Sequence, residues 1–325
     1  MAHGHGHAHG HAHDHSQGHP QGRAHGHAHG HRRRTDDAAR RALWWALALN
    51  GAFLAIEATA GFLSGSLALL SDAAHMVNDV AALSLALGVA WLARRPPSPR
   101  TTFGYRRAEV LGAMASGLAL LVACVVIFVE AIERLHAGAP DVPGWPILWV
   151  GLVGLGINLG SAWHLHRSGS ASLNVRGAML HMLMDAAGSA GAVLAALLVM
   201  AGMPSADPVV SLLTGALVLW AGVGLVRDAG RVLLESAPAH LDPREIRERL
   251  LAVEEVRDVH DLHVWSLDGE TVLLSAHVVV DEPDGGEPQR LAALLRDQLA
   301  IDHSTLQIER GTGCGAPPCP IHHGQ

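Results

Sequence analysis

Apolar residues gather into six long stretches between residues 43 and 235. Each stretch is close to the roughly 20 residues that an α-helix needs to cross a bilayer. The clearest stretch, Val110–Val129, contains no charged residue, and small residues are frequent in later ones, which suits close helix packing in lipid. We therefore expect six transmembrane helices. Their expected ranges are 43–63, 66–92, 108–133, 146–165, 174–202 and 208–227.

The pattern changes after Glu235, where charged residues alternate with short apolar runs. An amphipathic helix is expected over residues 243–253, followed by two strands that the turn Asp268-Gly269 joins. A further helix and a last strand complete the order helix-strand-strand-helix-strand. This order predicts a small cytoplasmic α/β domain of the ferredoxin-like or metallochaperone-like type. About 75 residues are marginal for an independent core, so dimerisation would help. The later elements are expected at 256–267, 271–280, 288–299 and 304–309.

Histidine alternates with Gly or Ala over residues 3–31, which hold 12 of the 24 histidines. Such a segment cannot bury a core and is expected to be disordered. We interpret it as a metal buffer or delivery arm, with an idle tail as the alternative. The predicted division is a disordered His-rich cytoplasmic tail (1–42), a six-helix transmembrane domain (43–235), a cytoplasmic α/β domain (236–311) and a Cys/His tail (312–325).

Charge is scarce in the chain and unevenly placed. Charged residues make up 16% of the sequence against 49% hydrophobic ones, and only 21 of them fall within the 193 positions from 43 to 235. This composition excludes a disordered, collagenous or disulfide-built chain and disfavours a soluble enzyme with one core. The net charge of −7 and the lack of a basic domain argue against nucleic acid as a partner.

Arginine is concentrated on one side of the expected spans. It flanks the start of the first span and the end of the sixth, and it fills the second and fourth connections. Because positive residues stay in the cytoplasm, both termini are expected there. The N-terminus lacks the apolar region of a signal peptide, and we expect a multi-pass protein of the inner, cytoplasmic membrane. These residues are Arg32–Arg34, Arg40, Arg41, Arg94, Arg95, Arg100, Arg106, Arg107, Arg167, Arg176, Arg227 and Arg231.

Two spans carry the same pair of ionisable residues near mid-membrane, where each such group needs an explanation. The pairs are His75 with Asp79 and His181 with Asp185, each at i and i+4 and hence on one helix face. Two facing pairs would supply two imidazole nitrogens and two carboxylate oxygens in a tetrahedral shell, which suits Zn²⁺. A structural hydrogen bond between helices is the alternative for each pair.

The first pair lies in SGSLALLSDAAHMVNDVAALSLAL, and FGYRRAEVLGAMASG follows after a basic loop. These segments, the second pair and the span count resemble the cation diffusion facilitator family over roughly residues 40–310. The resemblance implies a homodimeric antiporter that exports divalent metal from the cytoplasm in exchange for protons. His75, Asp79, His181 and Asp185 match the family's transport site, and this His-Asp-His-Asp set resembles that of the zinc-preferring members.

The ligands themselves explain how metal and proton fluxes can be coupled. Imidazole has a reference pKa of about 6.5, so a histidine binds metal when it is neutral and a proton otherwise. Zn²⁺ and protons therefore compete for the same lone pairs. We therefore expect Zn²⁺ as the substrate and protons as the counter-ion. The ligand set leaves cadmium and cobalt open as further substrates.

The cytoplasmic domain carries a second candidate site at His260, His277 and Glu309. Neighbouring strands can bring the two histidines together, and the resemblance supports all three residues as a regulatory zinc site. Packing is the alternative role for two strand histidines. His263, three residues after His260, is expected on the opposite strand face because side chains alternate along a strand.

Cys314 and Cys319 stand near the end of the chain with four residues between them. This spacing is wider than the CxxC common in zinc sites, and a cytoplasmic location disfavours a disulfide. Some family members bind a second metal with two such cysteines in this tail, which makes the pair a candidate metal site here.

Two other functions compete with transport. A membrane metalloenzyme of the di-iron type would need many histidines at cytoplasmic helix ends, whereas this chain has its pairs at mid-membrane. A membrane-embedded metal sensor would not need paired sites at that depth. We therefore expect a transporter and no enzyme activity.

Overall fold

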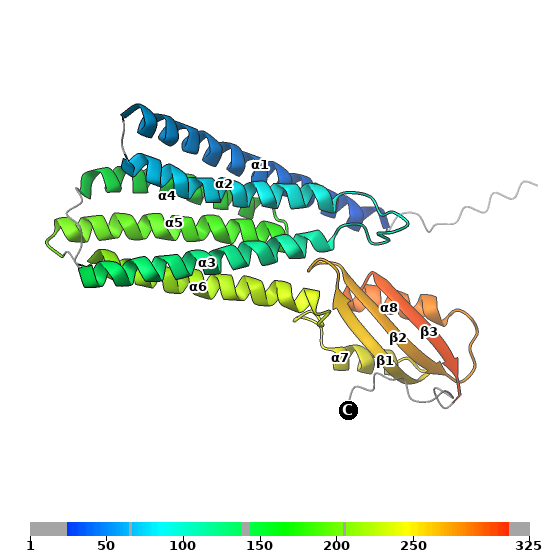
Figure 1. Cartoon of the computed structure of the whole chain (residues 1–325). Helices are drawn as coiled ribbons and strands as arrows, with labels where there is room; N and C mark the ends of the chain where they lie inside the picture. Colours follow the sequence, from blue (N-terminus) through cyan, green and yellow to red (C-terminus); the bar gives the residue numbers. More distant parts are fainter. Residues whose placement is uncertain (1–24, 65–66, 138–143, 204–205, 312–325) are drawn as a thin grey trace, which may run out of the picture.

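The computed structural model describes residues 25–64, 67–137, 144–203 and 206–311, although a few side chains within these ranges are not described. Figure 1 shows two parts, a bundle of long helices and a small α/β unit beside one end of it. The second connection of the bundle and the end of its last helix lie at the end that faces the α/β unit.

Six long helices form the bundle at the positions that the apolar stretches predict. Four of them, α2, α3, α5 and α6, are long and apolar enough to cross a membrane, judged over the described residues alone. Their outward side chains are apolar, as Trp220 at 77% exposure illustrates, which suits contact with lipid. The helices are α1 (His25–Ser64), α2 (Leu67–Ala93), α3 (Arg107–Ala137), α4 (Gly144–Arg167), α5 (Leu173–Met200) and α6 (Ala206–Leu233).

Helix α1 begins at His25 and thus includes residues 25–42, for which the sequence predicts disorder. Once the apolar part of the helix has formed, each further residue adds one hydrogen bond. Packing supports the extension, because Ala39 and Ala42 are buried among α2, α4 and α5. Asp37 also pairs with Arg94 at the end of α2. The remainder of the predicted disordered segment, residues 1–24, lies outside the described part.

Two of the three buried clusters in the described part of the bundle include buried residues of α5. One unites α1, α2, α4 and α5 and contains Leu43, Leu83, Leu165 and Met182. The other unites the starts of α3 and α5 with the end of α6 around residues such as Leu225. Helix α5 belongs to both clusters and lies against α2, which brings the two helices with the predicted ionisable pairs together.

The α/β unit has the predicted order of helix, two strands, helix and strand. Its sheet runs in the order β1-β2-β3, with β1 antiparallel to β2 and β3 parallel to it. Both helices cover the same face, where Ile246, Leu250, Leu291 and Leu295 join the strands in the core. The elements are α7 (Pro243–Leu251), β1 (Val256–Ser266), β2 (Val272–Val280), α8 (Glu287–Leu299) and β3 (His303–Arg310).

Strand β1 is irregular, and this corrects one prediction. His260 lies opposite His277 whereas His263 lies opposite Ser275, so three steps on β1 match two on β2. Asp261 between them has a left-handed φ of 50°, a departure from strand geometry that accompanies the bulge. His260 and His263 therefore share the face away from the helices, contrary to the prediction. The core-facing residues around the bulge are Val259, Leu262 and Val264.

The turn between β1 and β2 connects the two parts of the molecule. Arg106 in the α2–α3 connection donates from Nη1 to Asp268 Oδ2 at 3.3 Å and to Thr271 Oγ1 at 3.0 Å. Gly269 has φ +93°, and a Cβ there would stand 3.0 Å from Leu173 at the start of α5. The hairpin that carries two of the predicted cytoplasmic ligands thus contacts the helix that carries His181.

Candidate metal centres

Three of the four predicted transport residues form a cluster inside the bundle. The Nε2 atom of His181 lies 3.4 Å from Asp79 Oδ1 and 3.6 Å from Asp185 Oδ2. One ligand atom from each residue lies within 4.8 Å of the others. His181 and Asp185 share one face of α5, as their spacing predicts, and Asp79 faces them from α2. The cluster therefore spans the contact between two helices.

His75 completes the predicted set from one turn before Asp79 on α2. The backbone of α2 is described at this position, but the side chain of His75 lies outside the described residues. Its part in the site stays a prediction.

The cluster is largely shielded from solvent and suits a divalent ion. The side chains of His181, Asp79 and Asp185 are 14%, 20% and 24% exposed. Among the described residues, the buried His181 Nε2 and Asp185 Oδ2 atoms have no partner with hydrogen-bond geometry. Buried polar atoms normally have partners, and a metal ion would satisfy both of these. One imidazole nitrogen and two carboxylate oxygens fit Zn²⁺.

Two buried asparagines join α5 to neighbouring helices. Asn174 is fully buried and donates from Nδ2 to the Ala86 carbonyl of α2 at 2.7 Å. Asn50, also fully buried, places Nδ2 3.9 Å from the Met182 sulfur. These contacts join α5, which carries His181, to α2 and to α1. A polar residue at the start of an apolar stretch was the only sequence signal for Asn174.

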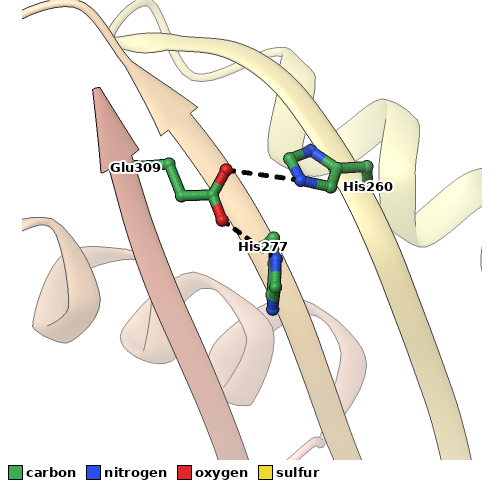
Figure 2. A group of neighbouring side chains, drawn as sticks. All are labelled: His260, His277 and Glu309. Atoms are coloured by element: carbon green, nitrogen blue, oxygen red, sulfur yellow. Dashed lines mark ion pairs between the residues drawn. The ribbon is translucent and has the colours of Figure 1, made fainter. Parts of the chain in front are cut away.

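The cytoplasmic candidates also lie together, on three adjacent strands (Figure 2). His260 of β1 and His277 of β2 are directly opposite each other, and their ring centroids are 5.3 Å apart. Glu309 of β3 lies between them. Its Oε2 atom is 3.4 Å from His260 Nε2, and its Oε1 atom is 3.0 Å from His277 Nδ1.

This cluster also fits a metal ion. The side chains of His260, His277 and Glu309 are 28%, 21% and 14% exposed, and their ligand atoms lie within 4.8 Å of one another. The buried His277 Nδ1 atom has no partner with hydrogen-bond geometry among the described residues. Two imidazoles and one carboxylate are three ligands of a tetrahedral zinc shell, which leaves room for a fourth. Sequence reasoning missed two aspartates beside this cluster, Asp258 and Asp261.

The two cysteines predicted as tail ligands, Cys314 and Cys319, lie outside the described residues. Their role stays a prediction.

Comparison with known proteins identifies the family. The cation efflux transmembrane domain matches residues 43–234, and the cytoplasmic domain of cation efflux proteins matches residues 238–311. The zinc transporter ZitB of Escherichia coli (strain K12) is 41% identical over 294 residues, covering 89% of this chain and 93% of that protein. The cadmium, cobalt and zinc/H⁺-K⁺ antiporter of Bacillus subtilis (strain 168) is 36% identical over 281 residues, covering 84% and 90%.

Among solved structures, the metal-bound C-terminal domain of the CzcD transporter from Cuprividus metallidurans is 35% identical to this chain. The match covers 21% of this chain and 99% of that domain, with a TM-score of 0.20. The family assignment rests on the sequence matches, since the transmembrane domain alone covers more than half of the chain. The chain is therefore a multi-pass membrane protein of the cation diffusion facilitator family, a family of metal transporters and not of enzymes.

Proposed function

We propose that this protein exports Zn²⁺ from the cytoplasm in exchange for protons, as a homodimeric antiporter. The observation that carries the proposal is the cluster of Asp79, His181 and Asp185 at the contact between α2 and α5. Charged residues are rare within membrane helices, and those that occur commonly mark ion pathways. Cadmium and cobalt remain further candidate substrates, because the same ligand types accept them.

The proposed transport site consists of His75, Asp79, His181 and Asp185, with Zn²⁺ as the substrate. Each helix contributes one imidazole and one carboxylate. The described distances of 3.4 and 3.6 Å between His181 and the two carboxylates suit ligands that converge on one ion. Because the ligands come from two helices, a small shift of α5 against α2 would separate them and release the ion.

Proton exchange follows from the same side chains. An imidazole that binds a proton on its ligand nitrogen no longer offers a lone pair to Zn²⁺. A proton from outside would thus displace the metal, and loss of that proton to the cytoplasm would restore the site. Alternating access requires two packings of the bundle that open the site to opposite sides. The Bacillus subtilis relative carries H⁺ in its name as an exchanged ion, which supports this counter-ion.

We propose that the protein lies in the inner, cytoplasmic membrane with both termini in the cytoplasm. The arginine-rich connection between α2 and α3 lies beside the α/β unit, in agreement with the positive-inside rule. The match of residues 238–311 to the family's cytoplasmic domain supports the same side. Dimerisation is proposed through this small domain, whose core is marginal by itself.

We also propose a regulatory zinc site at His260, His277 and Glu309. A bound ion would add positive charge between three strands and hold their side chains together. Because the sheet contacts the start of α5 through its first turn, occupancy of this site would influence the bundle.

Zinc flux into proteoliposomes tests the transport proposal. With the cytoplasmic side facing outward, we expect uptake of Zn²⁺ to acidify the exterior and to accelerate when the interior is acidic. His75→Ala should abolish both fluxes, whereas His164→Ala, at an exposed position on α4, should leave them unchanged. Zinc uptake that is indifferent to both the pH gradient and His75→Ala would contradict the proposal. A properly inserted protein without any metal flux would favour a membrane-embedded sensor.

A further inference from the structure

Both histidines of the cytoplasmic cluster have a second carboxylate on the side of the ring away from Glu309. His260 places Nε2 toward Glu309, and its Nδ1 atom is 3.7 Å from Asp258 Oδ2. His277 places Nδ1 toward Glu309, and its Nε2 atom is 3.7 Å from Asp261 Oδ2. Each imidazole thus lies between the shared glutamate, visible in Figure 2, and an aspartate of its own.

The two irregularities of β1 place these aspartates. The register of β1 against β2 shifts between Val256 and Asp258, and again between His260 and His263. In a regular strand, Asp261 would point away from its neighbour His260 and into the face that the helices cover. The left-handed φ of 50° at Asp261 keeps its carboxylate on the histidine face. Bulges commonly re-aim side chains next to functional sites.

Each aspartate is also anchored through its other oxygen. Asp258 Oδ1 accepts a hydrogen bond from Arg247 Nη2 of α7 at 2.8 Å. Asp261 Oδ1 lies 3.1 Å from His263 Nε2, within hydrogen-bond distance. Arg247 is itself fixed, because its Nε donates to the Val259 carbonyl at 2.9 Å. The two aspartates therefore repeat one arrangement on opposite sides of the cluster.

Metal-binding histidines almost always donate their second ring N–H to a carboxylate, a carbonyl or water, which fixes the tautomer and the ring orientation. We propose that Asp258 and Asp261 are positioning residues that direct Nε2 of His260 and Nδ1 of His277 toward a divalent cation. The inference rests on the proposed cytoplasmic site. The distance of 3.7 Å is longer than a hydrogen bond, and it shortens once the ion has drawn each ring into place.

This proposal also gives His263 a role. The bulge brings His263 to the same face as the two ligand histidines, where it holds Asp261 and does not reach Glu309 as His277 does. One series of contacts runs from Arg247 through Asp258 and His260 to Glu309. A second series runs from His263 through Asp261 and His277 to the same glutamate.

Binding of Co²⁺ to the full-length protein in detergent tests the inference, because tetrahedral Co²⁺ has an absorption spectrum that reports its ligand geometry. Asp79→Ala and Asp185→Ala are introduced first to remove the transport site. The signal of the cytoplasmic site is then the difference between this background protein and the same protein with His277→Ala. Asp258→Asn and Asp261→Asn should each weaken this binding about 10- to 100-fold and change the spectrum.

The matched control is Asp281→Asn, since Asp281 is an exposed aspartate in the same domain that pairs with Arg257; binding should remain unchanged. Asp258→Glu and Asp261→Glu keep a carboxylate and should restore part of the affinity, and circular dichroism checks the fold of every variant. The positioning role would be overturned if both asparagine variants bound Co²⁺ with the same affinity and spectrum as the background protein while His277→Ala still abolished the signal. An unchanged signal with His277→Ala would instead contradict the cytoplasmic site itself. Folded glutamate variants that bind no better than the asparagine variants would also count against the positioning role.

Discussion

The two ligand clusters of this protein use similar side chains in different mechanical settings. In the bundle, Asp79 comes from α2, and His181 and Asp185 come from α5. In the cytoplasmic domain, His260, His277 and Glu309 come from three strands. Neighbouring strands are joined by a ladder of backbone hydrogen bonds, whereas α2 and α5 are joined through side chains such as Asn174. The residues of the helix cluster are therefore less constrained relative to one another than those of the strand cluster.

The two clusters also differ in which histidine nitrogen the neighbouring aspartates approach. Both aspartates of the bundle cluster approach the ligand nitrogen of His181 itself. The aspartates beside the cytoplasmic cluster instead approach the opposite ring nitrogens. A site that must release its ion benefits from ligands free to separate, and a site that senses an ion benefits from rings already oriented. For the two proposed roles, we therefore expect mobility of the ligands, more than ligand type, to be the distinguishing property.

The largest difference between the two clusters is expected for a substitution of His181. His181→Ala removes the nitrogen that both carboxylates approach, and Asp79 and Asp185 would then face each other without it. We expect Zn²⁺ flux in proteoliposomes to fall to the level of protein-free vesicles, while Co²⁺ binding at the cytoplasmic cluster persists. His166→Ala, at an exposed position near the end of α4, serves as the control. Flux above half of the unmodified level would show that α5 does not carry the transport ligand.

Glu309→Gln should have the complementary effect. Glu309 approaches both histidines with separate oxygens, and an amide replaces a charged ligand with a neutral one. We expect the affinity of the cytoplasmic cluster to fall by about 100-fold, the upper end of the range for groups around a metal site. Zn²⁺ flux at saturating substrate should continue. Loss of flux equal to that of His181→Ala would mean that the two clusters do not have separate roles.

The apolar pattern was sufficient for most of the fold. Long stretches without charge determine helices in a membrane, because no other local structure satisfies the backbone there. The alternating runs after residue 235 likewise predicted the order of α7 to β3. The start of α1 was missed because Ala39 and Ala42 pack against distant helices, which the polar sequence before residue 43 does not reveal.

The candidate sites were predictable to different degrees. Asp79, His181 and Asp185 stand out because ionisable residues are rare in apolar stretches. His260 and His277 could be placed on neighbouring strands, whereas Glu309 depended on the family resemblance. The face of His263 and the role of Asp261 depend on a bulge, and a bulge shifts the period of the strand without a marker in the sequence. Acidic residues on exposed strands are too common to indicate Asp258.

A smaller effect is expected where the two regions meet. Asp268 is 2% exposed and accepts backbone hydrogen bonds from Glu270 at 3.0 Å and Thr271 at 2.7 Å, in addition to Arg106. Asp268→Ala leaves two amides in a partly buried turn without this acceptor, which destabilises the domain by about 1 kcal/mol. The unfolding temperature of the cytoplasmic domain should fall and Zn²⁺ flux should decrease severalfold. Asp297→Ala, on the exposed side of α8, should change neither, and an equal loss there would assign the effect to surface charge.

The smallest effect is expected far from both clusters, at Asp284 before α8. The Gly286 amide, which donates to Asp284 Oδ1 at 2.7 Å, and the Arg290 guanidinium hold the pKa of this exposed carboxyl below its ordinary value. A lowered folded-state pKa stabilises the domain above the ordinary pKa of about 3.9, and this stabilisation is lost as the pH falls through the lower value. Asp284→Asn should therefore lower the unfolding temperature by at most a few degrees at pH 7, and the difference should vanish in strong acid. Zn²⁺ flux and Co²⁺ binding should stay at the unmodified level, because a surface contact at this end of the domain moves neither the strands of one cluster nor the helices of the other. A change in Zn²⁺ flux or in Co²⁺ binding would show that the cytoplasmic cluster responds to the stability of its whole domain. The cluster would then be less rigid than its three paired strands indicate.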